Sequence, residues 1–95
     1  MVEMSSVYRL NEAVAIEDFG GRSLALNCDN LRLVELNATA RDMLARLDGA
    51  ANLNQVADTL SRDYQQPLEA IAQDVQAVIT QMAELGIVER VGERK

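Results

Sequence analysis

Residue types that commonly act in catalysis or bind metals are scarce in this sequence. It contains no histidine and a single cysteine, whereas histidine is the commonest general base and an ordinary zinc site combines several cysteines and histidines. The glycines of "FGGRS" (19–23) lack the spacing and the following helix that form a phosphate-binding loop. The sequence therefore predicts a non-enzymatic chain with no catalytic residue, no metal site and no cofactor.

The charge balance is acidic, with 15 Asp and Glu against 9 Lys and Arg and a formal net charge of -6. Carboxylates act as a general acid and base only when they share a cleft, and six of these 15 fall on expected helices, where outer faces are the expected place for them. The basic residues are dispersed and form no patch that could neutralise phosphates or anionic lipids. Neither a nucleic acid nor a membrane is therefore expected as a partner.

Two acidic positions allow more than one interpretation. Asp48, which precedes a glycine, either ends a helix or also fixes the following linker through hydrogen bonds from its side chain. Asp74 lies beside the apolar stripe of a long helix, where it is either solvated, or in contact with a ligand along that helix, or paired with an arginine (Arg41, Arg46 or Arg62).

The first part of the chain predicts an antiparallel sheet of three strands. Gly20-Gly21 separates two segments of alternating pattern, 13–19 and 22–28, which indicates a hairpin with a two-residue turn. A turn at "CDN" (28–30) leads into a third strand at 31–36. A short extended segment is also expected at 7–10.

The third strand has two apolar residues and one charge on each face, so its pattern does not show which face is buried. Leu31, Leu33 and Glu35 share one face, and Arg32, Val34 and Leu36 share the other. Two interpretations follow. The strand is either interior and packed on both faces, or an edge whose free backbone groups pair with an incoming extended peptide.

Three helices are expected in the second part of the chain. Asn37 is the predicted cap of a helix at 38–47, and "GAAN" (49–52) is a linker. Asn52 caps a helix at 53–64, and Pro67 begins the longest helix, at 67–85. A short extended tail at 87–91 follows. The prediction is an α+β fold in one domain, residues 1–95, with an ordered core at about 7–91.

No apolar run approaches the ~20 residues that span a bilayer, and the lone cysteine fits a reducing compartment. The expected location is therefore the cytoplasm.

Two stretches of the sequence resemble the PqqD family of small peptide chaperones, also described as recognition elements for ribosomal peptide modification. They are "LVELNATARDMLARLDG" (33–49) and "NLNQVADTLSRDYQQPLEAIAQDVQAVITQMAELGIVE" (52–89). The resemblance implies a winged-helix-like domain in which three strands are followed by three helices. It also implies that the chain binds the leader of a precursor peptide as an added strand and delivers it to a modifying enzyme, often a radical S-adenosylmethionine enzyme.

Carried over by position, the family's binding site would lie between the third strand and the third helix. The strand side would be Leu31, Arg32, Leu33, Val34 and Glu35, and the helix side would be Ala70, Asp74, Ala77, Val78 and Gln81. Many relatives have an aromatic residue in the third strand or the first helix, whereas "NLRLVEL" and "ARDMLARL" have none. The pathway therefore stays open, and the aliphatic site predicts Leu, Ile or Val on the leader.

Two other functions compete with peptide binding. The second and third helices could form the helix-turn-helix of a DNA-binding regulator, although 67–85 contains no Arg or Lys to enter a groove. Alternatively, the open strand edge could pair with a second copy in a structural homodimer.

Overall fold

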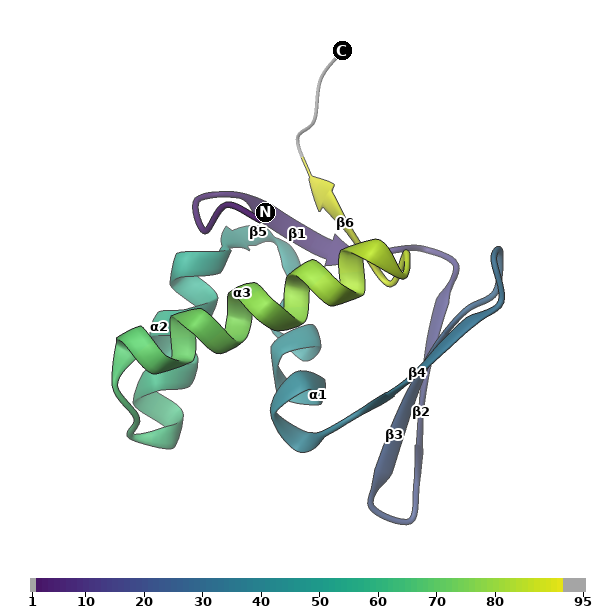
Figure 1. Ribbon diagram of the computed structural model, residues 1–95, viewed down its shortest axis with the longest axis horizontal. Helices are drawn as coiled ribbons and strands as arrows, with labels where there is room; N and C mark the ends of the chain where they lie inside the picture. The colour runs from purple at the N-terminus through teal and green to yellow at the C-terminus, as the bar shows by residue number, and fades with distance from the viewer. Residues whose placement is uncertain (1, 92–95) are drawn as a thin grey trace.

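The computed structural model describes residues 2–91. These residues form three helices and two three-stranded antiparallel sheets (Figure 1), so the predicted α+β fold is confirmed. The helices are α1 (Ala38–Ala45), α2 (Leu53–Tyr64) and α3 (Leu68–Glu84). One sheet has the order β5-β1-β6 and comprises β1 (Val7–Leu10), β5 (Asp48–Asn52) and β6 (Val88–Val91). The other has the order β2-β3-β4 and comprises β2 (Val14–Phe19), β3 (Arg22–Asn27) and β4 (Arg32–Leu36).

The hairpin of β2 and β3 turns at Gly20 and Gly21, as predicted. Both glycines have positive φ angles, 49° and 86°, and a two-residue turn with this backbone favours glycine because a side chain would be strained. Phe19 pairs with Arg22 directly across the turn. The same sheet continues into β4, where Ala25 pairs with Val34.

The prediction of a linker at 49–52 is wrong, because these residues belong to β5. This strand pairs with β1, with Val7 opposite Asn52. The Asp48 Oδ1 accepts hydrogen bonds from the amides of Ala50 and Ala51, both at 2.9 Å. Asp48 therefore does fix the segment after it, and these two hydrogen bonds lower the pKa of its carboxyl.

The helices begin at the predicted caps and bury an aliphatic core. Asn37 accepts from the Ala40 amide at 2.7 Å, and Asn52 forms a capping box with Gln55. On α2 and α3 the buried positions recur at helical spacing, as a face turned to the core requires. The largest fully buried side chains are Met43, Leu44, Leu53, Leu60, Val75, Ile79 and Ile87.

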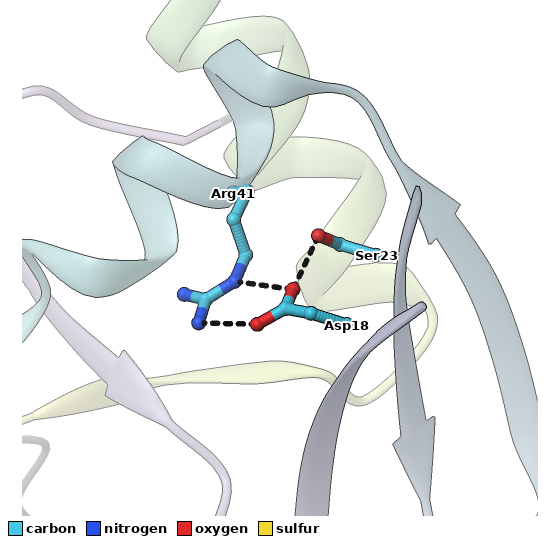
Figure 2. Close-up of polar contacts among 3 residues, drawn as sticks. All are labelled: Asp18, Ser23 and Arg41. Carbon is cyan, nitrogen blue, oxygen red and sulfur yellow. Dashed lines mark hydrogen bonds and ion pairs between the residues drawn. The ribbon is translucent and has the colours of Figure 1, made fainter. Parts of the chain in front are cut away.

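The sheet of β2, β3 and β4 extends to one side of the helices (Figure 1). Its hairpin is tied to α1 by Asp18, whose carboxylate accepts from Arg41 Nε at 3.3 Å and from Arg41 Nη2 at 3.4 Å. Ser23 Oγ donates to the same carboxylate at 2.5 Å (Figure 2). The Arg41 and Ser23 hydrogen bonds lower the pKa of Asp18. These contacts hold the sheet over the start of α1, where β4 ends.

Candidate functional site: an open strand edge beside α3

β4 has a strand neighbour on one side only. In the order β2-β3-β4 it pairs with β3, and no other strand of the described residues pairs with its second side. Of the two interpretations of 31–36, the structure therefore supports the edge strand. An edge strand presents a row of backbone donors and acceptors that another chain can use.

The free backbone groups of β4 belong to Leu33 and Glu35. The Cys28 amide donates to the Ala13 carbonyl at 2.9 Å, so this residue points toward β2. Successive residues of an antiparallel strand direct their N–H and C=O groups to opposite neighbours, so Ala25 points toward β4 and bonds its partner Val34. The N–H and C=O groups of Leu33 and Glu35 then face the open edge, where an added strand would bind.

The side chains of β4 divide between a buried face and a solvent face. Leu36 is only 4% exposed, and Val34 is partly buried and packs against the core. Leu33 is 60% exposed and lies on the opposite face. Glu35 shares the face of Leu33 and accepts from Arg22 at 2.9 and 3.1 Å, which lowers the pKa of its carboxyl. The face that carries Arg32, Val34 and Leu36 is therefore the inward one.

The helix side of the site comes from one stripe of α3. A hollow of about 230 Å³ joins Asp74, Ala77 and Val78 to the cap and the first two turns of α1 (Asn37, Thr39 and Met43). Ala70 and Gln81 share the stripe and are exposed, but they do not line this hollow. Nor do the predicted residues 31–35, because the hollow lies beyond the end of β4. Two larger hollows, of about 360 and 470 Å³, lie beside α2 and contain none of the predicted residues.

β4 and α3 run in opposite directions across the site. At one end, Asn37 and Asp74 line the same hollow. At the other, Asn27 Nδ2 donates to the Gly86 carbonyl at 2.7 Å and Asn30 Nδ2 donates to the Leu85 carbonyl at 3.4 Å. The helix between these ends is ~16 Å long, which matches about five residues of an extended strand. We call these two facing elements the β4–α3 site.

A family model described as "Coenzyme PQQ synthesis protein D (PqqD)" matches residues 23–88. The chain belongs to the PqqD family. The match runs from β3 into β6, so it includes both β4 and α3. The resemblance seen in the sequence is thereby confirmed.

Two solved structures have the same fold as this PqqD family member. "TbiB1 in Complex with the TbiA(beta) Leader Peptide" has a TM-score of 0.75 and 14% identity, and the alignment covers 92% of this chain and 99% of that chain. "Lasso peptide synthetase B1 complexed with the leader peptide" has a TM-score of 0.74 and 22% identity, with coverage of 86% and 96%. No curated protein matches the sequence.

The environment of Asp74 excludes one of its three interpretations. Asp74 makes no ion pair with any of residues 2–91, and the three arginines proposed as partners each pair elsewhere. These pairs are Arg41–Asp18, Arg46–Asp63 and Arg62–Asp58. The ion-pair interpretation is therefore wrong, and Asp74 is an exposed carboxylate beside the hollow of this PqqD family member.

Sequence reasoning missed part of the site. Asn37, Thr39 and Met43 line the hollow, but the sequence predicted only that Asn37 caps the helix that contains the other two. Asn27 and Asn30, which fix the other end, were assigned to the second hairpin strand and the following turn. A signal was available in that turn, because Asn in tight turns often bonds backbone groups through its side chain.

Within residues 2–91, no group of three or more His, Cys, Asp or Glu side chains could hold a metal ion. No helix in the same range is long and apolar enough to cross a membrane.

Proposed function

We propose that this chain binds the leader segment of a ribosomally made precursor peptide as a strand added to β4. The observation that carries the proposal is the free backbone edge at Leu33 and Glu35, which lies beside α3. Membership of the PqqD family supports it, as does the likeness to TbiB1 and to lasso peptide synthetase B1, both solved with leader peptides.

The energetics of such binding depend on side chains as well as on backbone pairing. The two free residues of β4 offer two N–H and two C=O groups, and each hydrogen bond contributes ~0.5–1.5 kcal/mol net. Ordering a disordered leader costs ~2–5 kcal/mol, which roughly offsets the backbone term. Apolar anchors, at ~1.5–3 kcal/mol for each side chain fully buried, then decide the affinity. Ala77 and Val78 offer a surface suited to an aliphatic anchor.

The chain's role is to present the peptide, and a separate enzyme modifies it. The family resemblance favours a radical S-adenosylmethionine enzyme as that partner. The lone cysteine fits the cytoplasm, a reducing compartment, as the place where the three components meet. The DNA-binding alternative gains no support from α3, which contains no Arg or Lys between Leu68 and Glu84. A homodimer that paired through β4 would occupy the same backbone groups as the peptide and would compete with it.

A ¹⁵N NMR titration tests the proposal. The probe is a synthetic leader from the precursor peptide encoded beside the gene for this chain. We expect amide shifts concentrated in 31–36 and on the face of α3 that carries Asp74 and Val78. Saturable binding with shifts confined to other elements would place the peptide elsewhere. An unchanged spectrum at millimolar peptide would contradict leader binding, provided that light scattering on the same sample gives a monomer whose edge is free.

A further inference from the structure

We infer that the β4–α3 site selects an extended peptide with an acidic and a basic side chain four positions apart. The acidic side chain lies beside Arg32 and the basic one beside Asp74. This inference rests on the proposed function and specifies the chemistry of the segment that the site accepts.

Arg32 is the cation at one end of the site. The other arginines with ion pairs in the described structure are Arg9, Arg22, Arg41, Arg46 and Arg62, and Arg90 also has a partner. Arg32 is exposed, and its side chain makes no ion pair with any of residues 2–91. It is the first residue of β4 and shares the inward face with Val34 and Leu36. An unpaired guanidinium beside an open strand edge is suited to a carboxylate on the added strand.

Asp74 is the anion at the other end. It is exposed, lines the hollow with Asn37 and Thr39, and has no ion pair among residues 2–91. No lysine or arginine occurs on α3 to compete for it. The other carboxylate close to the edge, Glu35, is already engaged by Arg22 on the solvent face of the sheet. A cation that reaches the Asp74 end therefore meets one free carboxylate.

The positions of these charges set the spacing. Arg32 follows Asn30, which bonds the end of α3 at Leu85, whereas Asp74 lines the hollow with Asn37, the residue directly after Leu36, where β4 ends. From Arg32 to Leu36 is four residues, or ~13 Å of strand. Residues four apart on an added strand point to the same face, because side chains alternate. The side chain midway between them would lie against Val34 and Val78.

The experiment is a set of selections from a phage-displayed library of random twelve-residue segments. Four forms of the full chain serve as bait: wild type, Asp74→Lys, Arg32→Glu and Glu69→Lys. Glu69 is the matched control, because it is an exposed acid on the same helix and lies five residues from Asp74, about 140° around the axis. Circular dichroism confirms that each variant is folded.

We expect wild-type binders to share an acidic and a basic residue four positions apart. Asp74→Lys should replace the basic residue by an acidic one, Arg32→Glu should replace the acidic residue by a basic one, and Glu69→Lys should leave the motif unchanged. Exposed ion pairs contribute ~0.2–1 kcal/mol. Exchanging the basic residue of a selected peptide for alanine should therefore weaken binding to wild type up to about five-fold, and should not weaken binding to Asp74→Lys.

Two results would overturn the inference while leaving leader binding intact. One is a set of binders that shift the β4 amides but lack opposite charges at this spacing. The other is the same motif selected by wild type and by Asp74→Lys. Binders that leave the β4 amides unshifted, or four selections without any enriched peptide, would overturn the proposed function as well.

Discussion

Asn27 joins the turn before β4 to the loop after α3 through one side chain. Its Oδ1 accepts from the amides of Asp29 at 2.8 Å and Asn30 at 3.2 Å, while its Nδ2 donates to the Gly86 carbonyl at 2.7 Å. The residue is 2% exposed. Gly86 has a φ of +76°, and an added Cβ there would lie 3.0 Å from Asn27 Nδ2, so the close approach needs glycine. One buried amide therefore fixes one end of the β4–α3 site.

Asn27→Ala should lower the free energy of unfolding by ~1–3 kcal/mol, because it leaves three partly buried backbone groups without their partner. Urea denaturation measures the loss. The control is Asn30→Ala, which removes two exposed hydrogen bonds, one of 3.4 Å to the Leu85 carbonyl and one of 2.9 Å from the Arg32 amide, and should cost less. Equal losses of unfolding free energy in the two variants would show that the Asn27 side chain stabilises the fold no more than the Asn30 side chain does.

The hydrogen bonds to Asp48 make the stability of β5 depend on pH. Ala51 and Ala50 donate to its carboxylate and lower its pKa in the folded state. The stabilisation is therefore complete above the ordinary aspartate pKa of about 3.9 and is lost as the pH falls through the lower, folded-state value. We expect the melting temperatures of wild type and Asp48→Asn to differ most at neutral pH and to converge below pH ~4. Asp29→Asn, in the exposed turn before β4, is the control. If the melting-temperature difference between wild type and Asp48→Asn stays constant across this pH range, the charge of Asp48 does not stabilise β5.

Peptide pairing at the β4 edge depends on which backbone groups of the strand point outward. The Leu33 N–H faces the open side, so proline at this position removes a donor that the β3 ladder does not use. Leu33→Pro should weaken leader binding roughly two- to twelve-fold, the equivalent of one hydrogen bond of ~0.5–1.5 kcal/mol. Leu33→Ala keeps the N–H and separates the backbone effect from the side chain. Fluorescence anisotropy with labelled leader measures both variants. Equal affinity of the proline and alanine variants would argue against an added strand.

The elements differed in how well the sequence predicted them. The Gly20-Gly21 turn was predictable because its backbone conformation favours glycine at both positions. β5 was not, because "DGAAN" has no β-branched or aromatic residue and gains its strand conformation from pairing with β1. Nor could the pattern of β4 show its buried face, since each face carries two apolar residues and one charge. Tertiary contact settles that point, as Val34 lies opposite the fully buried Ala25.

The candidate site also has parts that could be predicted from the sequence and parts that could not. The helix side with Asp74, Ala77 and Val78 was carried over from the family resemblance, and the structure brings these three together in one hollow. The pairing state of Asp74 could not be predicted, because it depends on where three arginines of other elements find their partners. The position of the hollow also depends on how the start of α1 packs against α3. The family resemblance therefore predicts one face of the site, whereas the depth of the hollow and the pairing of its charges come from tertiary structure.

The overall charge of the chain favours peptide binding over DNA binding. The formal net charge is -6, and among the described arginines only Arg32 has no partner. A DNA-binding domain needs several cations on one surface to displace counterions from phosphates. A single unpaired arginine cannot meet that requirement, but it can hold one carboxylate of a peptide.

The same net charge bears on whether the open edge pairs with itself. Two copies that paired through β4 would bring together two chains of charge -6, which repel one another. An edge that carries Arg32 and Glu35 is also of the kind that disfavours self-association. We therefore expect a monomer of 10.4 kDa by multi-angle light scattering from micromolar to submillimolar concentration, and no further mass beyond one peptide when leader is added. A mass that doubles with concentration in wild type but not in Leu33→Pro would show that the edge pairs with a second copy, and leader peptide would then have to displace that copy to bind.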